Sequence, residues 1–168
     1  MVRRLSLLLA LIFIVSLSVQ AQGFADKLEL YGGYSYMRFR SSPAANTNGW
    51  DLAGQYKFSR WLGAVADVGG EYGKVGGVNS NVYTYLFGPQ VSWPSRVSPF
   101  AHVLIGGSHF LGGSFSSKGI AMAIGAGVDT HLRNQLYWRV IQMDYIPTHL
   151  GGNTQGNTRL STGIVIRF

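Results

Sequence analysis

The sequence predicts an all-β protein, an eight-stranded antiparallel up-and-down transmembrane β-barrel. Eight segments alternate apolar with small or polar residues, which is the period of two of a β-strand with two different faces. The connections between the segments alternate in length, and the last segment, residues 158–168, ends on the aromatic residue Phe168. Together these three features are typical of a barrel whose apolar face contacts lipid.

The first 21 residues indicate a signal peptide that is removed on export. A pair of arginines forms a charged start, residues 5–19 form an apolar run, and small residues then offer cleavage after Ala21. A retained membrane helix is the alternative interpretation, but the run is shorter than the roughly 20 apolar residues that a span needs. We therefore expect residues 1–21 to be a signal peptide and residues 22–168 to form one barrel domain.

The amino-acid composition limits which kinds of ligand and partner the protein can have. Only 12% of the residues are charged, against about 25% in soluble domains, and glycine is abundant with 23 residues. Cysteine is absent, which excludes a disulfide framework and a thiolate metal site, and no cofactor-binding motif occurs. The net charge of +7 comes without a dense basic run, so nucleic-acid binding has little support. Lipid head groups are the anionic partner that we expect instead.

The predicted strands follow one another without a predicted helix between them. In order they are residues 27–39, 49–58, 62–72, 82–92, 99–109, 119–130, 136–146 and 158–168. The second is the most regular, with Trp50, Leu52 and Tyr56 on one face.

Three of these segments depart from simple alternation. In the fourth, Pro89 lies on the apolar face and predicts a local irregularity or a bulge. In the fifth, we place Ala101, Val103 and Ile105 outward and His102, Gly106 and Ser108 inward. In the seventh, Arg139 and Asp144 have opposite parity, so both can point inward only if a bulge lies between them.

The lengths of the connections indicate how the barrel is oriented. Three connections are short (residues 59–61, 93–98 and 131–135), and four are longer (residues 41–48, 73–81, 110–118 and 147–157). They alternate, long and then short, from the first to the last. Outer-membrane barrels have short periplasmic turns and longer external loops, so an even number of strands places both chain ends on the periplasmic side.

The content of the two faces favours a barrel in a membrane over a barrel in water. The polar face is mainly Gly, Ala, Ser and Thr with single charges, whereas a surface in water would carry many more Lys and Glu. Aromatic residues near the segment ends fit girdles at the depth of the lipid head groups; they are Trp50, Trp61, Trp93, Tyr137 and Trp138. A soluble exported barrel with an apolar cavity is the alternative.

Parts of the chain resemble a known family. They are the signal peptide, Leu30-Tyr31-Gly32-Gly33-Tyr34-Ser35-Tyr36 in the first predicted strand, and Ile164-Val165-Ile166-Arg167-Phe168 at the end. In these stretches the chain resembles the small outer-membrane β-barrel proteins of Gram-negative-type bacteria, related in architecture to the OmpA transmembrane domain. The resemblance implies a bacterial outer-membrane location, and it implies that Phe168 is a signal read by the barrel-assembly machinery. It implies no particular activity.

A set of charged residues is predicted to point into the lumen. They are Glu29, Asp51, Lys57, Asp67, Glu71, Asp129, Arg139, Asp144, Arg159 and Arg167. Unpaired charge in so narrow a space is costly, so we expect these residues to form an ion-pair network that plugs and stiffens the barrel. Exchange of these pairs to open a gated pore is the alternative, although eight strands leave little room for a solute.

An outer-membrane enzyme would need a histidine beside a nucleophile or a carboxylate near the membrane edge. The candidates are His102, Ser108, His109, Ser114 and His149. Their spacing matches no catalytic arrangement, so we predict no catalytic residue, no cofactor and no metal site.

Basic residues in the connections predict contacts with lipid. Arg60, Arg96 and Arg133 lie in the three short connections, where they can pair with lipid phosphates. Four more, Arg38, Arg40, Lys74 and Lys118, fall near the outer edge, where lipopolysaccharide phosphates lie. Simple solubilisation of the turns explains the same residues equally well.

The sequence thus predicts a monomeric outer-membrane barrel with a filled lumen and a structural or surface-interaction role. A narrow pore, or a transporter of small apolar molecules, is the first alternative. A lipid-A-modifying enzyme is the second. The expected partners are outer-membrane lipid, lipopolysaccharide and the barrel-assembly machinery, with no nucleic acid.

Overall fold

The fold is described by a computed structural model, which covers residues 27–39, 45–75, 78–112, 115–150 and 153–168. The strands are β1 (Leu28–Phe39), β2 (Ala45–Lys57), β3 (Leu62–Val75), β4 (Val78–Ser92), β5 (Val97–Gly112), β6 (Phe115–Arg133), β7 (Leu136–Leu150) and β8 (Asn153–Arg167). The expected signal peptide, residues 1–21, lies outside the described residues.

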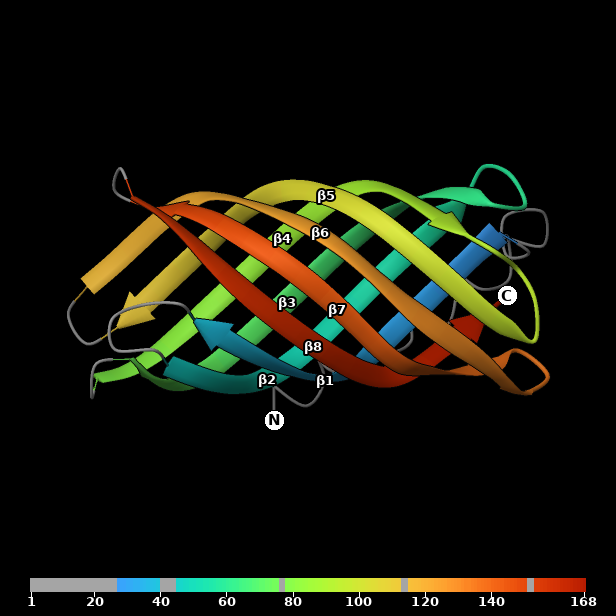
Figure 1. Ribbon diagram of the computed structural model, residues 1–168, viewed down its shortest axis with the longest axis horizontal. Coiled ribbons are helices and arrows are strands. Elements are labelled where there is room, and N and C mark those ends of the chain that lie inside the picture. Colours follow the sequence, from blue (N-terminus) through green and yellow to red (C-terminus); the bar gives the residue numbers. More distant parts are fainter. Residues whose placement is uncertain (1–26, 40–44, 76–77, 113–114, 151–152) are drawn as a thin grey trace, which may run out of the picture.

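Every strand pairs antiparallel with its neighbour in the sequence, and β1 pairs with β8 to close the barrel (Figure 1). The all-β, eight-stranded, up-and-down architecture predicted from the sequence is therefore confirmed. The closing ladder runs from Glu29, opposite Arg167, to Phe39, opposite Asn157. Closure removes the free edges that an open sheet would expose. No helix in the described part of the chain has the length and hydropathy needed to cross a membrane.

The barrel has two different ends. At one end the strands are joined by residues 58–61, 93–96 and 134–135, and Phe168 ends the chain there; we call this the turn end. The opposite end, on the left in Figure 1, is the loop end. Asn134 begins the two-residue turn between β6 and β7 and has a φ of 50°, a left-handed conformation that asparagine tolerates better than most residues.

The strands extend further at the loop end than the sequence predicts. The predicted loops at residues 41–48, 73–81, 110–118 and 147–157 are strand over most of their described length. β2, for example, already begins at Ala45, before the polar residues Asn46 and Thr47. The predicted extent of the loops is therefore wrong. Hydropathy alternation fades where both faces of a strand are polar, although the ladder to the neighbouring strands continues.

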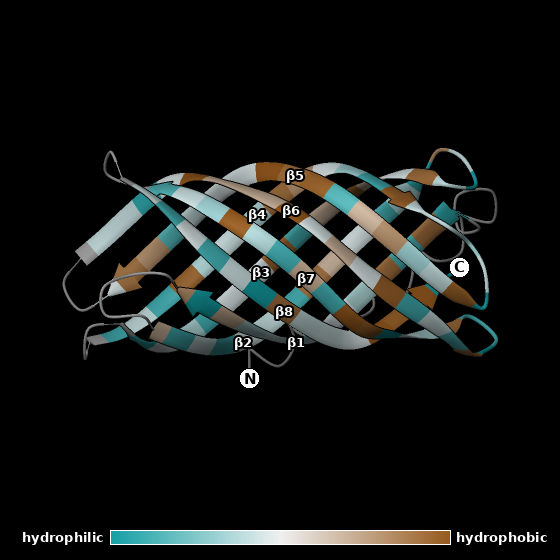
Figure 2. Ribbon diagram, viewed as in Figure 1, coloured by the Kyte–Doolittle hydropathy of each residue, from teal (hydrophilic) through white to brown (hydrophobic). Residues whose placement is uncertain are grey.

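The two faces of the sheet differ in the way that alternation predicts. Leu52, Val103 and Ile124 point outward with about half of their surface exposed, at 52%, 48% and 51%. Figure 2 shows hydrophobic and hydrophilic residues alternating along the strands. A barrel in water would bury its apolar face, whereas this barrel exposes it and turns its described acidic residues inward.

The structure also shows how β5 and β7 face. In β5 the outward residues are Ala101, Val103 and Ile105 and the buried residues include His102 and Ser108, which confirms the predicted facing. In β7 the register to β8 shifts between Arg139 and Gln142, and Val140 and Ile141 are both exposed. This bulge turns both Arg139 and Asp144 inward, as their charges predicted.

β4 passes Pro89 without a bulge. Its register to β5 is the same at Phe87 and at Gln90, but ladder pairs are missing at Gly88 and Pro89. Proline has no N–H to donate, which accounts for an interruption at this point. The predicted local irregularity is therefore present, whereas a bulge, the other form that was predicted, is absent at this point.

Aromatic side chains form two bands on the outside of the barrel. Trp61, Trp93 and Trp138 are exposed near the turn end, and Tyr34, Tyr72 and Tyr145 are exposed toward the loop end. The chain advances eleven residues from Trp61 to Tyr72. At about 3.3 Å per residue and a tilt of about 40°, this advance spans about 28 Å, close to the apolar band of outer-membrane barrels, which is about 25 Å tall.

One of the aromatic residues predicted for the girdles lies elsewhere. Tyr137 faces the lumen, two residues before Arg139, and the guanidinium carbon of Arg167 lies 3.9 Å from its ring centre. Trp50 lies in the loop-end band, where its Nε1 donates to Tyr72 Oη at 3.1 Å. The placement of Tyr137 on the outside is therefore wrong.

Candidate functional site

Arg159 lies near the middle of β8 and is fully buried in the lumen. The register places it directly opposite Asp144 of β7. Its Nε and Nη2 donate to Asp144 Oδ2 at 2.9 and 2.8 Å. Its Nη1 and Nη2 each donate to Asp67 at 3.1 Å, and Nη1 also donates to Asp51 Oδ1 at 3.3 Å. One cation thus ties β8 to β2, β3 and β7 through charge-assisted hydrogen bonds.

Three carboxyl groups surround this one guanidinium. Other polar side chains supply further contacts. His102 Nε2 lies 2.9 Å from Asp144 Oδ1, and Gln142 Nε2 donates to Asp144 Oδ2 at 2.8 Å. Ser161 Oγ donates to Asp51 Oδ2 at 3.0 Å. These contacts supply the partners that buried charge requires.

The chain of polar contacts continues from the centre toward the turn end. Arg139 Nη1 donates to Gln142 Oε1 at 2.6 Å, and Arg139 Nε donates to Asp129 Oδ1 at 2.8 Å. Arg167 Nη2 then donates to Asp129 Oδ2 at 2.9 Å, and Arg167 Nε lies 2.8 Å from Glu29 Oε1. Asp129 and Arg139 are direct cross-strand partners, as are Glu29 and Arg167, so strand register builds these pairs.

Aromatic rings pack against the cation of Arg139. Its guanidinium carbon lies 4.2 Å from the ring centres of both Tyr31 and Phe100, at distances that allow cation–π attraction. Beside them, Gln90 Nε2 donates to Gln55 Oε1 at 2.8 Å. Packed side chains therefore fill the lumen around Arg139, as is usual in barrels of eight strands.

The remaining two charged residues of the predicted set lie at opposite ends. Lys57 forms an ion pair with Glu29 at the turn end. Glu71 lies on the loop-end side of Arg159 and accepts a hydrogen bond from Ser35 Oγ. All ten residues predicted to carry lumen charge face inward, and all except Glu71 are joined by ion pairs or through Gln142. We call this joined set the lumen charge network.

Several polar or aromatic members of this arrangement were not part of the set of charged lumen residues predicted from the sequence. They are His102, Gln142, Ser161, Tyr31 and Phe100. Alternation can place such a residue on the inward face, but its partner comes from another strand. Gln142 is harder still, because it faces inward only through the bulge in β7.

The residues considered as catalytic candidates do not converge. His102 lies within the lumen charge network, and Ser108 is six residues further along β5, roughly 20 Å away at about 3.3 Å per residue. His109 and His149 lie near the loop end, and Ser114 is outside the described residues. Within the described ranges, no group of three or more His, Asp or Glu side chains is arranged to hold a metal ion.

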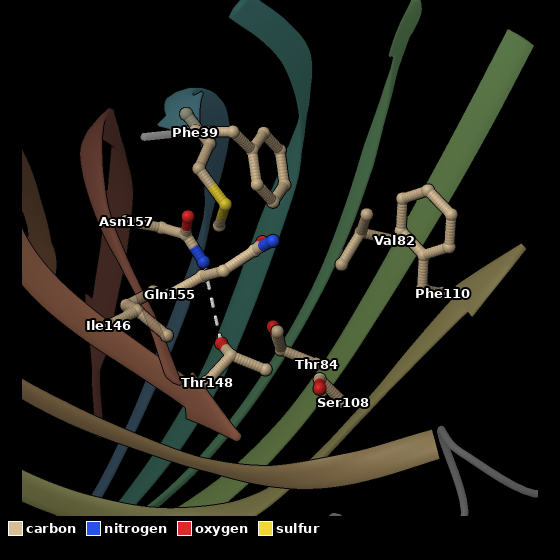
Figure 3. Close-up of a pocket in the computed structure, with 10 residues that line it drawn as sticks. Phe39, Val82, Thr84, Ser108, Phe110, Ile146, Thr148, Gln155 and Asn157 are labelled. Carbon is tan, nitrogen blue, oxygen red and sulfur yellow. Dashed lines mark hydrogen bonds between the residues drawn. The ribbon is translucent and has the colours of Figure 1, made fainter. Parts of the chain in front are cut away.

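A cavity of about 180 Å³ lies in the lumen on the loop-end side of Arg159 (Figure 3). It is lined by Met37 and Phe39 of β1, Val82 and Thr84 of β4, Ser108 and Phe110 of β5, Ile146 and Thr148 of β7, and Gln155 and Asn157 of β8. Ile146 lies two residues beyond Asp144 on the same face, and Asn157 is related to Arg159 in the same way. The lumen charge network therefore lies next to this cavity on its turn-end side, although none of its residues lines it. We call this cavity the loop-end chamber.

Acidic and basic residues are segregated between the inside and the outside. The six acidic residues of the described ranges are all buried in the lumen: Glu29, Asp51, Asp67, Glu71, Asp129 and Asp144. The exposed charged residues there are all basic: Lys27, Arg38, Arg60, Lys74, Arg96, Lys118 and Arg133. Arg40 lies outside the described residues. The outer surface of the described barrel is therefore cationic at both ends.

Solved structures of similar shape place this architecture among known proteins. Neisserial surface protein A has a TM-score of 0.71 with 16% identity, over 84% of this chain and 97% of its own. OprG from Pseudomonas aeruginosa has a TM-score of 0.59 with 13% identity, over 86% and 96%. Ail, the attachment invasion locus protein of Yersinia pestis, has 0.55 with 17% identity, over 84% and 99%. The chain has the fold of the small outer-membrane barrels.

No protein-family model matches the sequence, and no curated protein matches it significantly. At identities of 13–17% the likeness to these barrels establishes the fold alone. The function has to be argued from the lumen and the surface of this chain.

Proposed function

We propose that this protein is a monomeric, non-conducting barrel of the bacterial outer membrane with a structural or surface-interaction role. The exposed apolar face, the two aromatic bands and the likeness to outer-membrane barrels support this location. In this orientation the turn end faces the periplasm and the loop end faces the outside. The lumen charge network closes the passage between them.

The complete burial of Arg159 among three carboxylates is the observation that carries this proposal. A solute path through the centre would have to separate Arg159 from at least one of them. Breaking a buried ion pair costs about 3–5 kcal/mol. Since about 1.4 kcal/mol is a factor of ten, a cost of about 4 kcal/mol leaves roughly one barrel in a thousand open.

Single-channel recording in planar bilayers tests the proposal. The wild type should give no stable conductance steps. The variant Arg159→Ala/Asp67→Ala/Asp144→Ala removes the centre of the network and should conduct, which shows that the assay detects an opened barrel of this size. Wild-type steps as large as those of the variant would contradict a closed lumen.

We also propose that the exposed basic residues bind lipid phosphates. Arg60, Arg96 and Arg133 would meet phospholipid head groups at the periplasmic side. At the external side, Arg38, Lys74 and Lys118 would meet the phosphates of lipopolysaccharide. The segregation of charge supports this, because no acidic side chain is exposed on the described surface to compete for these cations.

Phe168 supports a proposed contact with the barrel-assembly machinery. Its backbone N–H donates to Leu28 O at 3.0 Å, so the last residue is fixed beside the seam between β1 and β8. Phe168 is 41% exposed at the turn end. A terminal ring in this position is accessible from the periplasm while the barrel closes.

The catalytic alternative, modification of lipid A, has less support. His102 is engaged by Asp144, and Ser108 lies apart from it in the loop-end chamber. We infer a role without catalysis. Mass spectra of lipid A from cells with and without the protein should be identical, and a new lipid A mass in its presence would contradict the inference.

A further inference from the structure

Three polar atoms in the loop-end chamber have no hydrogen-bond partner within the described chain. They are Thr84 Oγ1, Ser108 Oγ and Asn157 Oδ1. Their residues are buried, with exposed fractions of 2%, 1% and 3%. Buried polar groups in folded proteins nearly always have a partner, so three such atoms around one cavity point to a molecule that bonds there.

These atoms come from opposite walls of the chamber. Thr84 and Ser108 are direct cross-strand partners on β4 and β5, so their side chains are neighbours on the lumen face. Asn157 belongs to β8, where its Nδ2 donates to Thr148 Oγ1 at 3.4 Å. Figure 3 shows Thr84 and Ser108 on one side of the chamber and Asn157 on the other. A molecule between these walls can therefore bond with both.

The remaining walls of the chamber are mostly apolar. Met37, Val82 and Ile146 are buried, and the rings of Phe39 and Phe110 complete this part of the lining. None of the lining side chains carries a charge. An ion would lose its hydration there without gaining a counter-charge, so the chamber suits a neutral molecule.

The volume limits the size of that molecule. The chamber measures about 180 Å³. An apolar cavity of about 150 Å³ binds benzene. The loop-end chamber therefore has room for one six-membered ring with a small polar substituent, or for a short chain of similar volume.

We propose that the loop-end chamber binds one small neutral molecule that joins an apolar ring or short chain to a hydroxyl or amide group. The apolar part lies against Met37, Val82 and Ile146. The polar group bonds with the hydroxyls of Thr84 and Ser108. Because the lumen charge network closes the lumen on the turn-end side of the chamber, the molecule enters and leaves at the loop end, and binding requires no passage through the barrel.

Titration with phenol and with benzene tests this proposal in lipid nanodiscs. The methyl signals of Met37 and Ile146 in NMR spectra report occupancy, and phenol should shift both. The variant Thr84→Val/Ser108→Ala keeps the shape of the wall and removes both hydroxyls. It should weaken phenol binding about tenfold, the effect of roughly one hydrogen bond, and leave benzene binding unchanged.

Two further variants make the readout specific. Val82→Phe fills the chamber and should abolish the binding of both probes, whereas Thr130→Val removes a hydroxyl near the turn end and should leave both affinities unchanged. A heat-modifiable gel shift confirms that each variant is folded. Equal phenol affinity in the wild type and the double variant, or no methyl shift with phenol, overturns the proposal. Conductance is recorded separately, so the proposal of a closed lumen and the proposal of a ligand in the loop-end chamber can fail independently.

Discussion

Replacing Arg159 with methionine should strongly destabilise the barrel. Methionine keeps much of the aliphatic bulk but carries no charge, so the carboxylates of Asp51, Asp67 and Asp144 would remain buried without their cation. The hydrogen bonds that Arg159 donates to them would all be lost. Removing one partner of a buried pair costs about 3–5 kcal/mol, and three carboxylates share this partner, so we expect a loss of at least about 4 kcal/mol.

Charge balance should account for most of this loss. The variant Arg159→Met/Asp51→Asn/Asp67→Asn also removes two of the stranded charges, and it should recover much of the stability because replacing a whole buried ionic group is often neutral. Urea unfolding in lipid vesicles, read from the heat-modifiable gel shift, measures both variants. The reasoning is refuted if Arg159→Met lies within about 1 kcal/mol of the wild type, the value of an exposed ion pair. Equal losses of stability in the two variants would refute the claim that unpaired carboxylates cause the destabilisation.

Other regions allow comparisons between matched variants. Gly125→Ala should cost about 1–3 kcal/mol because its Cβ would overlap Asp144 and His102, whereas Gly54→Ala, whose Cβ meets only Leu30 at 3.7 Å, should stay within about 0.5 kcal/mol of the wild type. Urea unfolding in vesicles measures both, and equal effects would contradict the tight packing at Gly125. Changing Arg60, Arg96 and Arg133 together to glutamine should weaken binding to anionic liposomes, and unchanged binding would remove the lipid-phosphate proposal. Deleting Phe168 should lower the yield of assembled barrel in cells far more than Phe58→Ala, which removes another exposed ring at the turn end. Similar yields would argue against an assembly signal.

The middle of each strand could be predicted from the sequence because lipid and lumen select opposite residue types there. The third predicted strand, residues 62–72, lies within β3 for this reason. In β7 the positions of two charged residues also predicted a bulge. Arg139 and Asp144 could both face the lumen only through a bulge, and the structure contains that bulge.

Outside the apolar band, the alternation of apolar and polar residues no longer marks the strands. Asn46 and Thr47 are both polar, although one is exposed and the other buried, so alternation could not show that β2 begins before them. Tyr137 was misplaced for a related reason, because an amphipathic ring suits either a head-group region or a lumen lined by arginine.

The contacts of the lumen depend on closure of the barrel. Arg159 reaches Asp51 and Asp67 on strands that are far from β8 in the sequence, and only the pairing of β1 with β8 brings them together. The loop-end chamber was hidden in the same way. Nothing local to Thr84 or Asn157 distinguishes these residues from other inward polar residues, and their shared cavity exists only in the closed barrel.

The side-chain Nε–H of Arg159 offers the most direct test of a closed lumen. In lipid nanodiscs its NMR signal should persist long after transfer to deuterated buffer, because this proton bonds with Asp144 at 2.9 Å on a fully buried side chain. Arg60, exposed at the turn end, provides the internal comparison and should exchange at once. Exchange of Arg159 as fast as that of Arg60 would show that water reaches the centre, and it would contradict a lumen closed by the charge network.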